Sequence, residues 1–405
     1  MSEVTKPIVL DETVQALNHL IAHQNAAIDL LASDKRAELV TNVAEIAQLC
    51  KNGEILEVMD YGDEIHPEWV EGSDHYNPAM NLCHEADAVL EDQESIHGAF
   101  FEWDKTLPFA TQFDAPEAIY YFDGTESAGT YYIPIGVDYG TGWSHLKAIQ
   151  FTLTAAPDAD DQLVIDCGQN NANDPTDGRT WNVYAKGSTV SKQSGTTSNG
   201  TSGNSLGTIS PTDAQATNGR LNAMARVVYG YNRWSQSGLR QYLNSDADSG
   251  WWTPQNPWDR PHALASTKKG FLAGYDASVR QYFKPIKVVT VACNADNNVE
   301  DITYDRVFLS SLEQMYCVPQ FSGKEGEYWE YYKRLLGRTT PAPTSATYAR
   351  LIKYGLGGTT AQNCFRRSAT RYYAYTVWYV NASGHVTTTN AFNANRCAPS
   401  VFISD

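Results

Sequence analysis

The closing stretch of the chain, residues 363–405, reads NCFRRSATRYYAYTVWYVNASGHVTTTNAFNANRCAPSVFISD. Aromatic residues stand beside arginines here, small polar residues make up much of the rest, and Lys, Glu, Gln and Met are absent. Tyrosine and tryptophan give large, stiff contact areas, arginine adds a planar set of donors, and asparagine, serine and glycine add adaptable hydrogen bonds. The composition is therefore typical of a contact surface.

The pattern within this stretch predicts a β-hairpin. Branched and aromatic residues from Thr376 to Val380 indicate a strand, residues 381–384 indicate a turn in which Gly384 takes a positive φ, and residues 385–389 form the return strand. We expect six apolar residues of the stretch to face the core: Phe365, Val377, Val380, Val386, Pro399 and Phe402.

Charge differs between this end and the rest of the chain. The formal net charge of −17 over 405 residues opposes long-range attraction of the whole molecule to nucleic acid or to an anionic membrane. From Ser322 onward, however, ten Lys or Arg residues stand against four Asp or Glu residues. A basic end suits an anionic or polar ligand, and it suits equally well docking onto the acidic remainder.

Targeting signals and cysteine usage limit the cellular compartments in which the protein is expected. The opening MSEVTKPIVL lacks the basic and apolar regions of a classical signal peptide. No apolar run approaches the roughly 20 residues of a membrane helix. The seven cysteines are scattered without a CxxC spacing, so we expect them to be reduced and mostly buried. We expect a protein made in a cytosol that stays there, or leaves by assembly into a particle or by lysis.

Residues 1–53 are expected to be helical. Apolar residues between Val14 and Leu31 recur at steps of three and four, and a second apolar face follows from Leu39 to Leu49, ending near Asn52 and Gly53. A polar residue, Gln24, interrupts the first stripe, as in coiled coils that set their oligomer number this way. The segment therefore predicts a homo-oligomer, with a trimer among the options, or an intramolecular helical hairpin.

The remainder divides by composition into three segments. Short runs rich in aromatic and branched residues predict a β-sandwich or jelly-roll-like domain over 54–186. Residues 187–204, rich in Ser, Thr and Gly, form a loop or linker. A third domain covers 205–405, and the fold class is α+β. The acids and histidines between Asp60 and Glu85 have no metal-ligand spacing and are interpreted as a solvated acidic face.

Within residues 205–405, the sequence favours a helix capped by Ser235, a tryptophan-rich loop over 250–261 anchored on the core, a helix over 276–283, and a buried strand over 287–293. The segments WSQS (234–237), LRQYLN (239–244), GWWTPQN, GFL (270–272), VFL (307–309) and NRCAPS together resemble a DUF6273-type domain of phage and gut-bacterial proteins. That domain is similar to the C-type-lectin-like fold of formylglycine-generating enzymes.

The closing segment resembles the variable region of target proteins of diversity-generating retroelements. The resemblance implies that adenines are randomised during reverse transcription, so that AAY codons become NNY codons, which do not encode Lys, Glu, Gln, Met or Trp. The first four are missing after Asn363, and Trp378 is then a fixed position. Composition bias in a short aromatic segment is the alternative explanation.

On this interpretation, residues 363–405 contain displayed and fixed positions. Arg367, Ser368, Trp378, Arg396 and Cys397 are expected to belong to the scaffold, with Arg396 satisfying buried carbonyls. The candidates for ligand contact are Arg366, Thr370, Arg371, Tyr372, Tyr373, Tyr375, Tyr379, His385, Thr387, Thr389, Asn390, Phe392, Asn393 and Asn395.

Catalysis is not favoured by the sequence of this end. No Asp or Glu lies between Tyr331 and Ser404, so the carboxylates needed for hydrolysis or for a calcium site are missing there. Cys364 and Cys397 are candidates for the cysteine pair of a formylglycine-generating enzyme, but similarity of fold does not carry function and nothing near them supports that role. We expect no catalytic residue, metal or cofactor.

These observations predict a non-enzymatic binding protein of a phage tail that recognises a host cell-surface protein or glycan. Its expected partners are that receptor, other tail proteins and further copies of itself, with neither nucleic acid nor membrane insertion. It is expected in the virion, or otherwise in the bacterial cytoplasm or at the cell surface by a non-classical route. The alternatives are a constant virion structural or assembly protein and an enzyme of the formylglycine-generating type.

Overall fold

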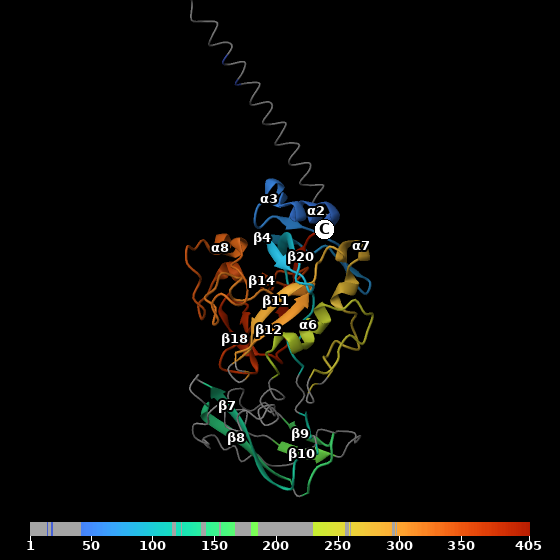
Figure 1. The fold of residues 1–405 in the computed structure, drawn as a ribbon, viewed down its shortest axis with the longest axis vertical. Helices are drawn as coiled ribbons and strands as arrows, with labels where there is room; N and C mark the ends of the chain where they lie inside the picture. Colours follow the sequence, from blue (N-terminus) through green and yellow to red (C-terminus); the bar gives the residue numbers. More distant parts are fainter. Residues whose placement is uncertain are drawn as a thin grey trace, which may run out of the picture.

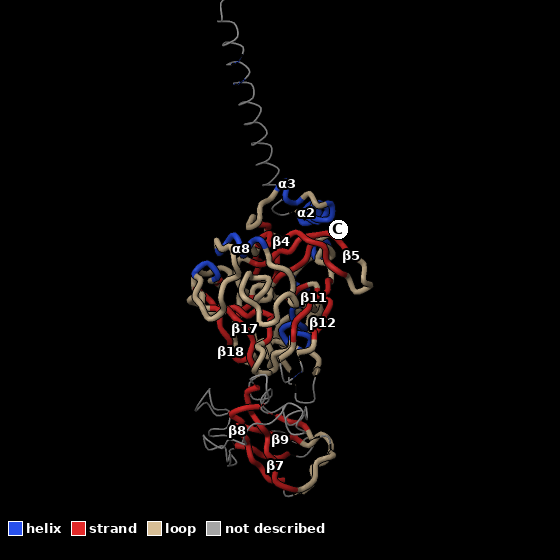
Figure 2. The backbone as a smooth tube through the Cα atoms, turned by 60° about the vertical axis from the view of Figure 1, so that its left-hand side comes forward, coloured by secondary structure: helices blue, strands red, loops and turns tan. Residues whose placement is uncertain are grey.

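The computed structural model describes residues 14, 18, 42–115, 119–122, 124–138, 143–153, 155–166, 180–184, 230–255, 259, 261–293, 296 and 298–405. The fold is mixed α/β, with few helices and many strands in curled sheets (Figures 1 and 2). None of the helices in the described ranges combines the length and the apolar content that a bilayer crossing requires.

The described chain opens on α2 (Val43–Asn52) and α3 (Ile55–Val58). The Asn42 side chain accepts a hydrogen bond from the Glu45 N–H at the start of α2, and Gly53 ends it with a φ of 72°. This confirms the helix end predicted near Asn52 and Gly53, because glycine reaches that conformation without strain. Apart from Val14, the predicted stripe up to Leu31 falls on residues outside the described ranges.

The central sheet joins both ends of the described chain. Its order is β1-β4-β5-β20-β13, from β1 (Glu64–Ile65), β4 (Met80–Val89), β5 (Ser95–Trp103), β20 (Ser400–Ile403) and β13 (Val307–Phe308). Every neighbouring pair is antiparallel. The C-terminus lies beside α2 in Figure 1, where Lys51 Nζ is 3.3 Å from the Asp405 carboxylate.

This sheet differs from the expected division of the chain. The sequence predicts a separate sandwich over 54–186, yet β5 of that range pairs with β20, and both strands bury side chains in one core with residues 307–309. The predicted boundaries at 53/54 and 186/205 therefore do not separate the strands of this sheet. Composition could not reveal the pairing, because strands about 300 residues apart meet only in the folded chain.

Five strands of the middle region lie together at the far end of Figure 1, away from α2. They are β6 (Ile119–Tyr121), β7 (Gly129–Asp138), β8 (Trp143–Leu153), β9 (Gln162–Asp166) and β10 (Thr180–Tyr184). β7 pairs with β8, and β10-β9-β6 form a second sheet. The Asp114 carboxylate accepts the Ala115 N–H at 2.9 Å and the Tyr231 N–H at 2.8 Å. Asp114 and Tyr231, which stand before and after the middle region in the sequence, therefore lie next to each other. The predicted linker over 187–204 lies outside the described residues.

Short helices and small sheets surround the core. The helices are η1 (Trp234–Gln236), α6 (Gly238–Leu243), η2 (Phe271–Gly274), α7 (Ala277–Arg280), α8 (Glu330–Leu336) and η4 (Ala349–Leu351). The paired strands are β2 (Trp69–Glu71) with β3 (Asp74–Tyr76), β11 (Ile286–Val291) with β12 (Glu300–Asp305), and β14 (Lys353–Tyr354) with β15 (Ala361–Gln362).

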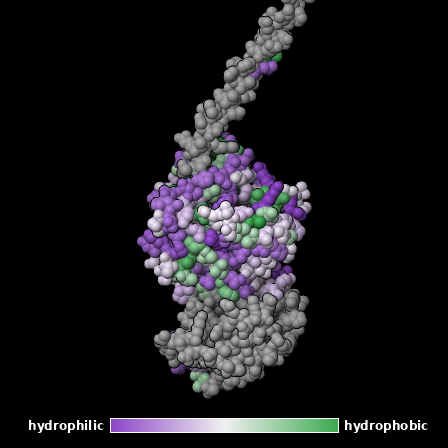
Figure 3. All heavy atoms as spheres, turned by 180° about the vertical axis from the view of Figure 1, so that it is seen from behind, coloured by the Kyte–Doolittle hydropathy of each residue, from purple (hydrophilic) through white to green (hydrophobic). Residues whose placement is uncertain are grey.

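Local predictions over residues 234–293 are largely confirmed, with one shift at the start of a helix and one at the end of another. Ser237 rather than Ser235 caps α6, because its hydroxyl accepts the Arg240 N–H. The helix predicted over 276–283 is present as α7, which is capped by Asp276 and ends at Arg280. In the tryptophan loop, Trp251 is buried and Trp252 half-buried. Outside this core, the face seen in Figure 3 is mostly hydrophilic, with hydrophobic residues scattered over it.

Candidate functional site

A four-stranded sheet carries the candidate ligand-binding residues. Its order is β18-β17-β16-β19, from β16 (Cys364–Ala369), β17 (Thr376–Val380), β18 (Val386–Asn390) and β19 (Arg396–Cys397). The predicted hairpin is confirmed, since β17 and β18 pair antiparallel and Gly384 has a φ of 82° in the turn between them. All six residues expected to face the core are buried.

Hydrogen bonds to backbone carbonyl oxygens stabilise the loop over 370–376, which lies between β16 and β17. The Asn232 Nδ2 donates to the carbonyl oxygens of Tyr373 at 2.7 Å, Thr376 at 2.8 Å and Thr370 at 3.5 Å. The Asn232 N–H also donates to the Ala374 carbonyl oxygen at 3.0 Å. Thr370 adds contacts from its hydroxyl to the Tyr373 carbonyl at 2.9 Å and to the Thr376 hydroxyl at 2.6 Å. Backbone bonds of this kind fix the loop shape independently of the outward side chains.

Five of the candidates lie on that loop; Thr370 is buried, and Arg371, Tyr372, Tyr373 and Tyr375 are half-buried. The Arg371 guanidinium lies 5.8 Å from the ring centroids of both Phe321 and Tyr372, within cation–π range. The rings of Tyr373 and Tyr375 meet edge to face, with centroids 5.7 Å apart. The loop thus carries a group of interacting aromatic and cationic side chains.

The turn after β18 lies next to the loop. The Ala391 N–H donates to the Tyr375 carbonyl oxygen at 2.9 Å, which joins the two segments. Phe392 and Asn393 are half-buried on this turn, and the Asn393 amide donates to the Thr389 hydroxyl at 2.6 Å. The structure therefore brings the candidates of the loop and of the turn together.

The candidates on β17 and β18 do not all share one face. Tyr379 is paired with Thr387, and Val377 with Thr389, so Tyr379, Thr387 and Thr389 project from the same side of the sheet. Asn390 is paired with Thr376 and projects from the other side. His385 precedes β18, whereas Phe392 follows it, which separates them by roughly 20 Å along a strand. His385 is therefore outside the group formed by the loop and the turn.

Three predicted contact residues are buried and unavailable to a ligand at the surface. Arg366 is 0% exposed, Thr370 is 3% exposed and Asn395 is 8% exposed. Thr370 holds the loop, and the Asn395 amide oxygen accepts from Asn363 at 3.1 Å, so both are structural. The remaining eleven candidates are half-buried and are called the display surface below: Arg371, Tyr372, Tyr373, Tyr375, Tyr379, His385, Thr387, Thr389, Asn390, Phe392 and Asn393.

Arg366 instead belongs to a buried charge cluster beneath the sheet. Its Nη1 is 3.2 Å from Glu102 Oε2 and 2.6 Å from the Ser310 hydroxyl, and Lys353 Nζ is 3.0 Å from Glu102 Oε1. The Tyr332 hydroxyl also donates to Glu102. Burial by itself raises the pKa of Glu102, but Lys353 and Arg366 outweigh it and hold that pKa at about 2. The carboxylate is thus charged and fully partnered, as a structural ion pair must be.

The predicted scaffold residues are placed as expected. Arg367 is 2% exposed and donates to the Leu309 carbonyl oxygen at 2.6 Å and to Gln314 Oε1. The Arg396 side chain donates to the Leu107 carbonyl oxygen at 3.1 Å. Trp378 is 6% exposed. Sequence reasoning missed Asn232 and Glu102, since each acts on residues more than 130 positions away and lies in no recognisable motif.

Neither a cysteine site nor a metal site is present in the described ranges. Cys364 and Cys397 are fully buried, and burial raises the pKa of both thiols, which disfavours the reactive thiolate. Among the described residues, no group of three or more His, Cys, Asp or Glu side chains is arranged to hold a metal ion.

Comparison with known proteins identifies one domain. Residues 215–403 match the family model described as Domain of unknown function (DUF6273). A DUF6273 domain is therefore detected in the C-terminal half, where the sequence resemblance placed it. Searches of the curated proteins and of the solved structures each return no match.

Proposed function

We propose that this protein is a non-enzymatic binding protein that recognises its ligand through the display surface. The observation that carries the proposal is the set of bonds from Asn232 to the carbonyl oxygens of Thr370, Tyr373 and Thr376. Because the backbone is held from within, the side chains of Arg371, Tyr372, Tyr373 and Tyr375 can serve contact rather than folding.

The chemistry of these side chains supports binding. Tyr and Arg dominate protein-recognition hot spots, because they combine a large contact area with hydrogen bonds at little entropic cost. Thr387 and Thr389 add hydroxyl groups on the face shared with Tyr379. A surface of this kind suits the hydroxyl-rich face of a glycan and the mixed surface of a protein receptor.

A finer proposal follows from the sequence resemblance. The domain is a C-type-lectin-like scaffold whose display surface is diversified by a retroelement, and the protein acts at a phage tail in host recognition. The burial of Arg367, Trp378 and Cys397 beside half-buried Tyr372, Tyr373 and Tyr375 supports a division into fixed and exchangeable positions.

The alternative in another class is a constant virion structural protein, in which the display surface packs against a neighbouring subunit. It is favoured by the same aromatic composition, and it differs in predicting a protein partner from the same particle. A formylglycine-generating activity is the weakest alternative, because Cys364 and Cys397 are both enclosed in the core.

The test uses the full-length protein on an array of bacterial surface glycans and on a panel of intact bacterial cells. Wild type should bind at least one of these targets. The triple variant Tyr372→Ala, Tyr373→Ala, Tyr375→Ala should lose that binding with its thermal unfolding nearly unchanged. Tyr354→Ala, which removes a 38% exposed tyrosine on β14, is the matched control and should bind normally.

Two outcomes would contradict the proposal. Unchanged binding by the triple variant would place the ligand elsewhere, and marked unfolding would make the three tyrosines structural. The retroelement proposal has its own test in the genome. A reverse-transcriptase gene should lie nearby, with a near-copy of the coding sequence for residues 363–405 that differs chiefly where the copy has adenine, and its absence would favour the structural-protein alternative.

A further inference from the structure

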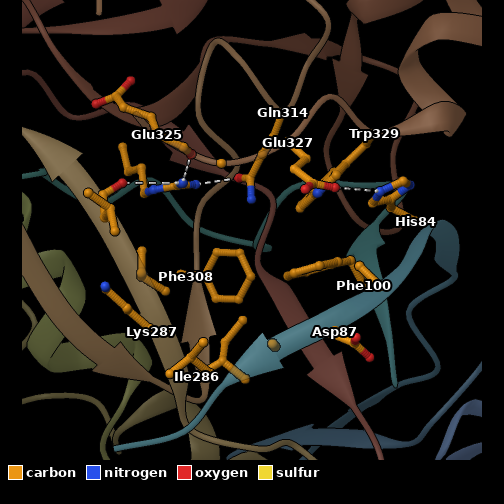
Figure 4. Close-up of a pocket in the computed structure, with 17 residues that line it drawn as sticks. His84, Asp87, Phe100, Ile286, Lys287, Phe308, Gln314, Glu325, Glu327 and Trp329 are labelled. Carbon is orange, nitrogen blue, oxygen red and sulfur yellow. Dashed lines mark hydrogen bonds and ion pairs between the residues drawn. The ribbon is translucent and has the colours of Figure 1, made fainter. Parts of the chain in front are cut away.

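A cavity of about 260 Å³ lies between β4 and β11, and none of its lining residues belongs to the display surface (Figure 4). The two strands are bridged at one end through Leu90 and Ile286, and otherwise they belong to separate sheets. Residues 86–89 and 286–289 all line the cavity. Because side chains alternate along a strand, consecutive residues border one cavity only where the backbone edge faces it. The cavity is thus a gap between two strand edges.

Aromatic rings form much of the wall of this gap. Phe100 meets Phe308 with ring centroids 6.1 Å apart and Trp329 with centroids 5.3 Å apart. Ile286 and Ala88 add aliphatic wall. Phe308 and Trp329 are each 1% exposed, so they are fixed by the core rather than free to rearrange. Rigid flat walls of this kind suit a flat apolar group.

One polar side chain of the cavity wall, Gln314, has a hydrogen-bond donor that no described residue accepts from. Gln314 is 5% exposed, and its Oε1 accepts from the Ser311 N–H at 3.1 Å and from Arg367. Two donors at one atom identify that atom as the oxygen, so the other is the NH₂ group. No described residue accepts from this NH₂ group, and Figure 4 shows Gln314 pointing toward Phe308. The residue is otherwise enclosed, and this NH₂ group remains available to donate to a ligand acceptor in the cavity.

The mouth of the cavity carries more acid than base. The side chains of Glu327 and Asp87 are 84% and 71% exposed, and Lys287 is the exposed cation of the lining. Glu327 lies 3.6 Å from His84, and burial lowers the pKa of His84 although Glu327 opposes that shift. Asp87 also contacts His97 at 2.8 Å. Over the whole lining, the carboxylates of Asp87, Glu325 and Glu327 stand against the cations of Lys287 and Arg367, an excess of acid that disfavours an anionic ligand.

We propose that this cavity binds a small neutral compound with one ring and a carbonyl or amide oxygen. The ring lies among Phe100, Phe308 and Trp329, and the oxygen accepts a hydrogen bond from the Gln314 NH₂ group. The volume is just below the roughly 300 to 1,000 Å³ typical of pockets for drug-sized ligands, which favours a single ring. Since the lining is separate from the display surface, the inference stands independently of the proposed function.

Benzamide is the probe that tests the proposal, with benzoate and benzylamine as charged analogues of similar size. The full-length protein is titrated with each compound by ligand-observed NMR and calorimetry. Benzamide should bind more tightly than benzoate, because the mouth repels the carboxylate. Benzylamine should bind more weakly than benzamide, because it offers Gln314 no acceptor.

Gln314→Glu is the decisive variant. It keeps an oxygen for Ser311 and Arg367 and replaces the NH₂ donor by a second acceptor, so it should weaken benzamide binding about tenfold, as expected for loss of one buried hydrogen bond. Asp87→Asn, at the mouth, is the matched control and should leave benzamide binding within about twofold while improving benzoate binding. Ala86→Phe, which fills the gap, should abolish binding of all three compounds.

The following results would overturn the proposal. Failure of wild type to bind benzamide at millimolar concentration would overturn the proposal, as would equal affinity of wild type and Gln314→Glu. If Gln314→Glu does not fold, Ala86→Phe decides, because persistent benzamide binding to a folded, filled variant would place the site elsewhere.

Discussion

The Glu102 carboxylate and the Arg366 guanidinium form a fully buried ion pair, 3.2 Å apart, between residues separated by 264 positions in the chain. Glu102 lies on β5 of the central sheet and Arg366 on β16 of the sheet that carries the display surface. The pair therefore couples the two sheets. It also explains why Arg366, which the sequence predicts as a contact residue, is part of the scaffold.

Removing the charge of Glu102 should destabilise the central sheet together with the sheet that carries the display surface. Glu102→Gln leaves Arg366 and Lys353 buried without a carboxylate, and a broken buried pair costs about 3 to 5 kcal/mol. Denaturant unfolding measures this loss. Glu330→Gln removes a half-exposed carboxylate that pairs with Lys333 at 3.0 Å, and it should change the unfolding free energy by less than about 1 kcal/mol. Equal effects of the two variants would refute a special role for the buried pair.

Asn232 should control the shape of the loop over 370–376. Asn232→Ala removes the three side-chain bonds to loop carbonyls and should cost about 1 to 3 kcal/mol. Asn232→Asp should cost more, since it turns an acceptor toward carbonyl oxygens. Hydrogen exchange of the loop amides should accelerate in both. Asn393→Ala, on the display surface, is the control and should leave loop exchange unchanged; if it accelerates exchange as much as Asn232→Ala, the loop depends on displayed side chains.

Acid should weaken the fold through His262. This histidine is 2% exposed, and burial lowers its pKa from 6.5 to about 4 even though the Gln112 carbonyl opposes the shift. The unfolded chain binds the proton more readily than the folded chain, so the stabilisation is present above pH 6.5 and is lost as the pH falls toward 4. His262→Gln should flatten the unfolding free energy between these pH values. The exposed His75→Gln should not, and a slope unaltered by His262→Gln would exclude this histidine as the cause.

Two tryptophans should differ in their contribution to stability. Trp234 is 0% exposed and its indole N–H donates to Asp305 at 2.8 Å, so Trp234→Ala should cost about 3 to 5 kcal/mol. Trp252 is half-buried, so Trp252→Ala should cost distinctly less. Urea unfolding of both variants gives the comparison, and a larger loss at Trp252 would contradict the burial of the two side chains.

Part of this fold could be predicted from the sequence, because it depends on residues that are close together in the chain. Alternation and the glycine at position 384 predicted the hairpin of β17 and β18 to within a residue, because strand and turn preferences act over a few positions. The buried Arg367 and the bond from Arg396 to a carbonyl were also expected.

Contacts between distant parts of the chain could not be predicted from the sequence in this way. The position of β20 between β5 and β13, and the burial of Arg366, depend on partners far away in the chain. Arg366 and Arg367 are adjacent arginines with similar composition around them, so nothing local indicates that Glu102 accepts one of them. His385 is one of the predicted contact residues, yet a full strand separates it from Phe392.

If a constant scaffold holds exchangeable side chains, the fold should tolerate a library of variants on the display surface. Ten positions of the display surface, all except His385, are encoded by NNY codons and presented on phage, and protease resistance of the members is measured. A matched library randomises Asn232, Arg366, Arg367 and Thr370. We expect most members of the first library to stay protease-resistant and most members of the second to lose resistance. Loss of resistance in most members of the first library would contradict this expectation.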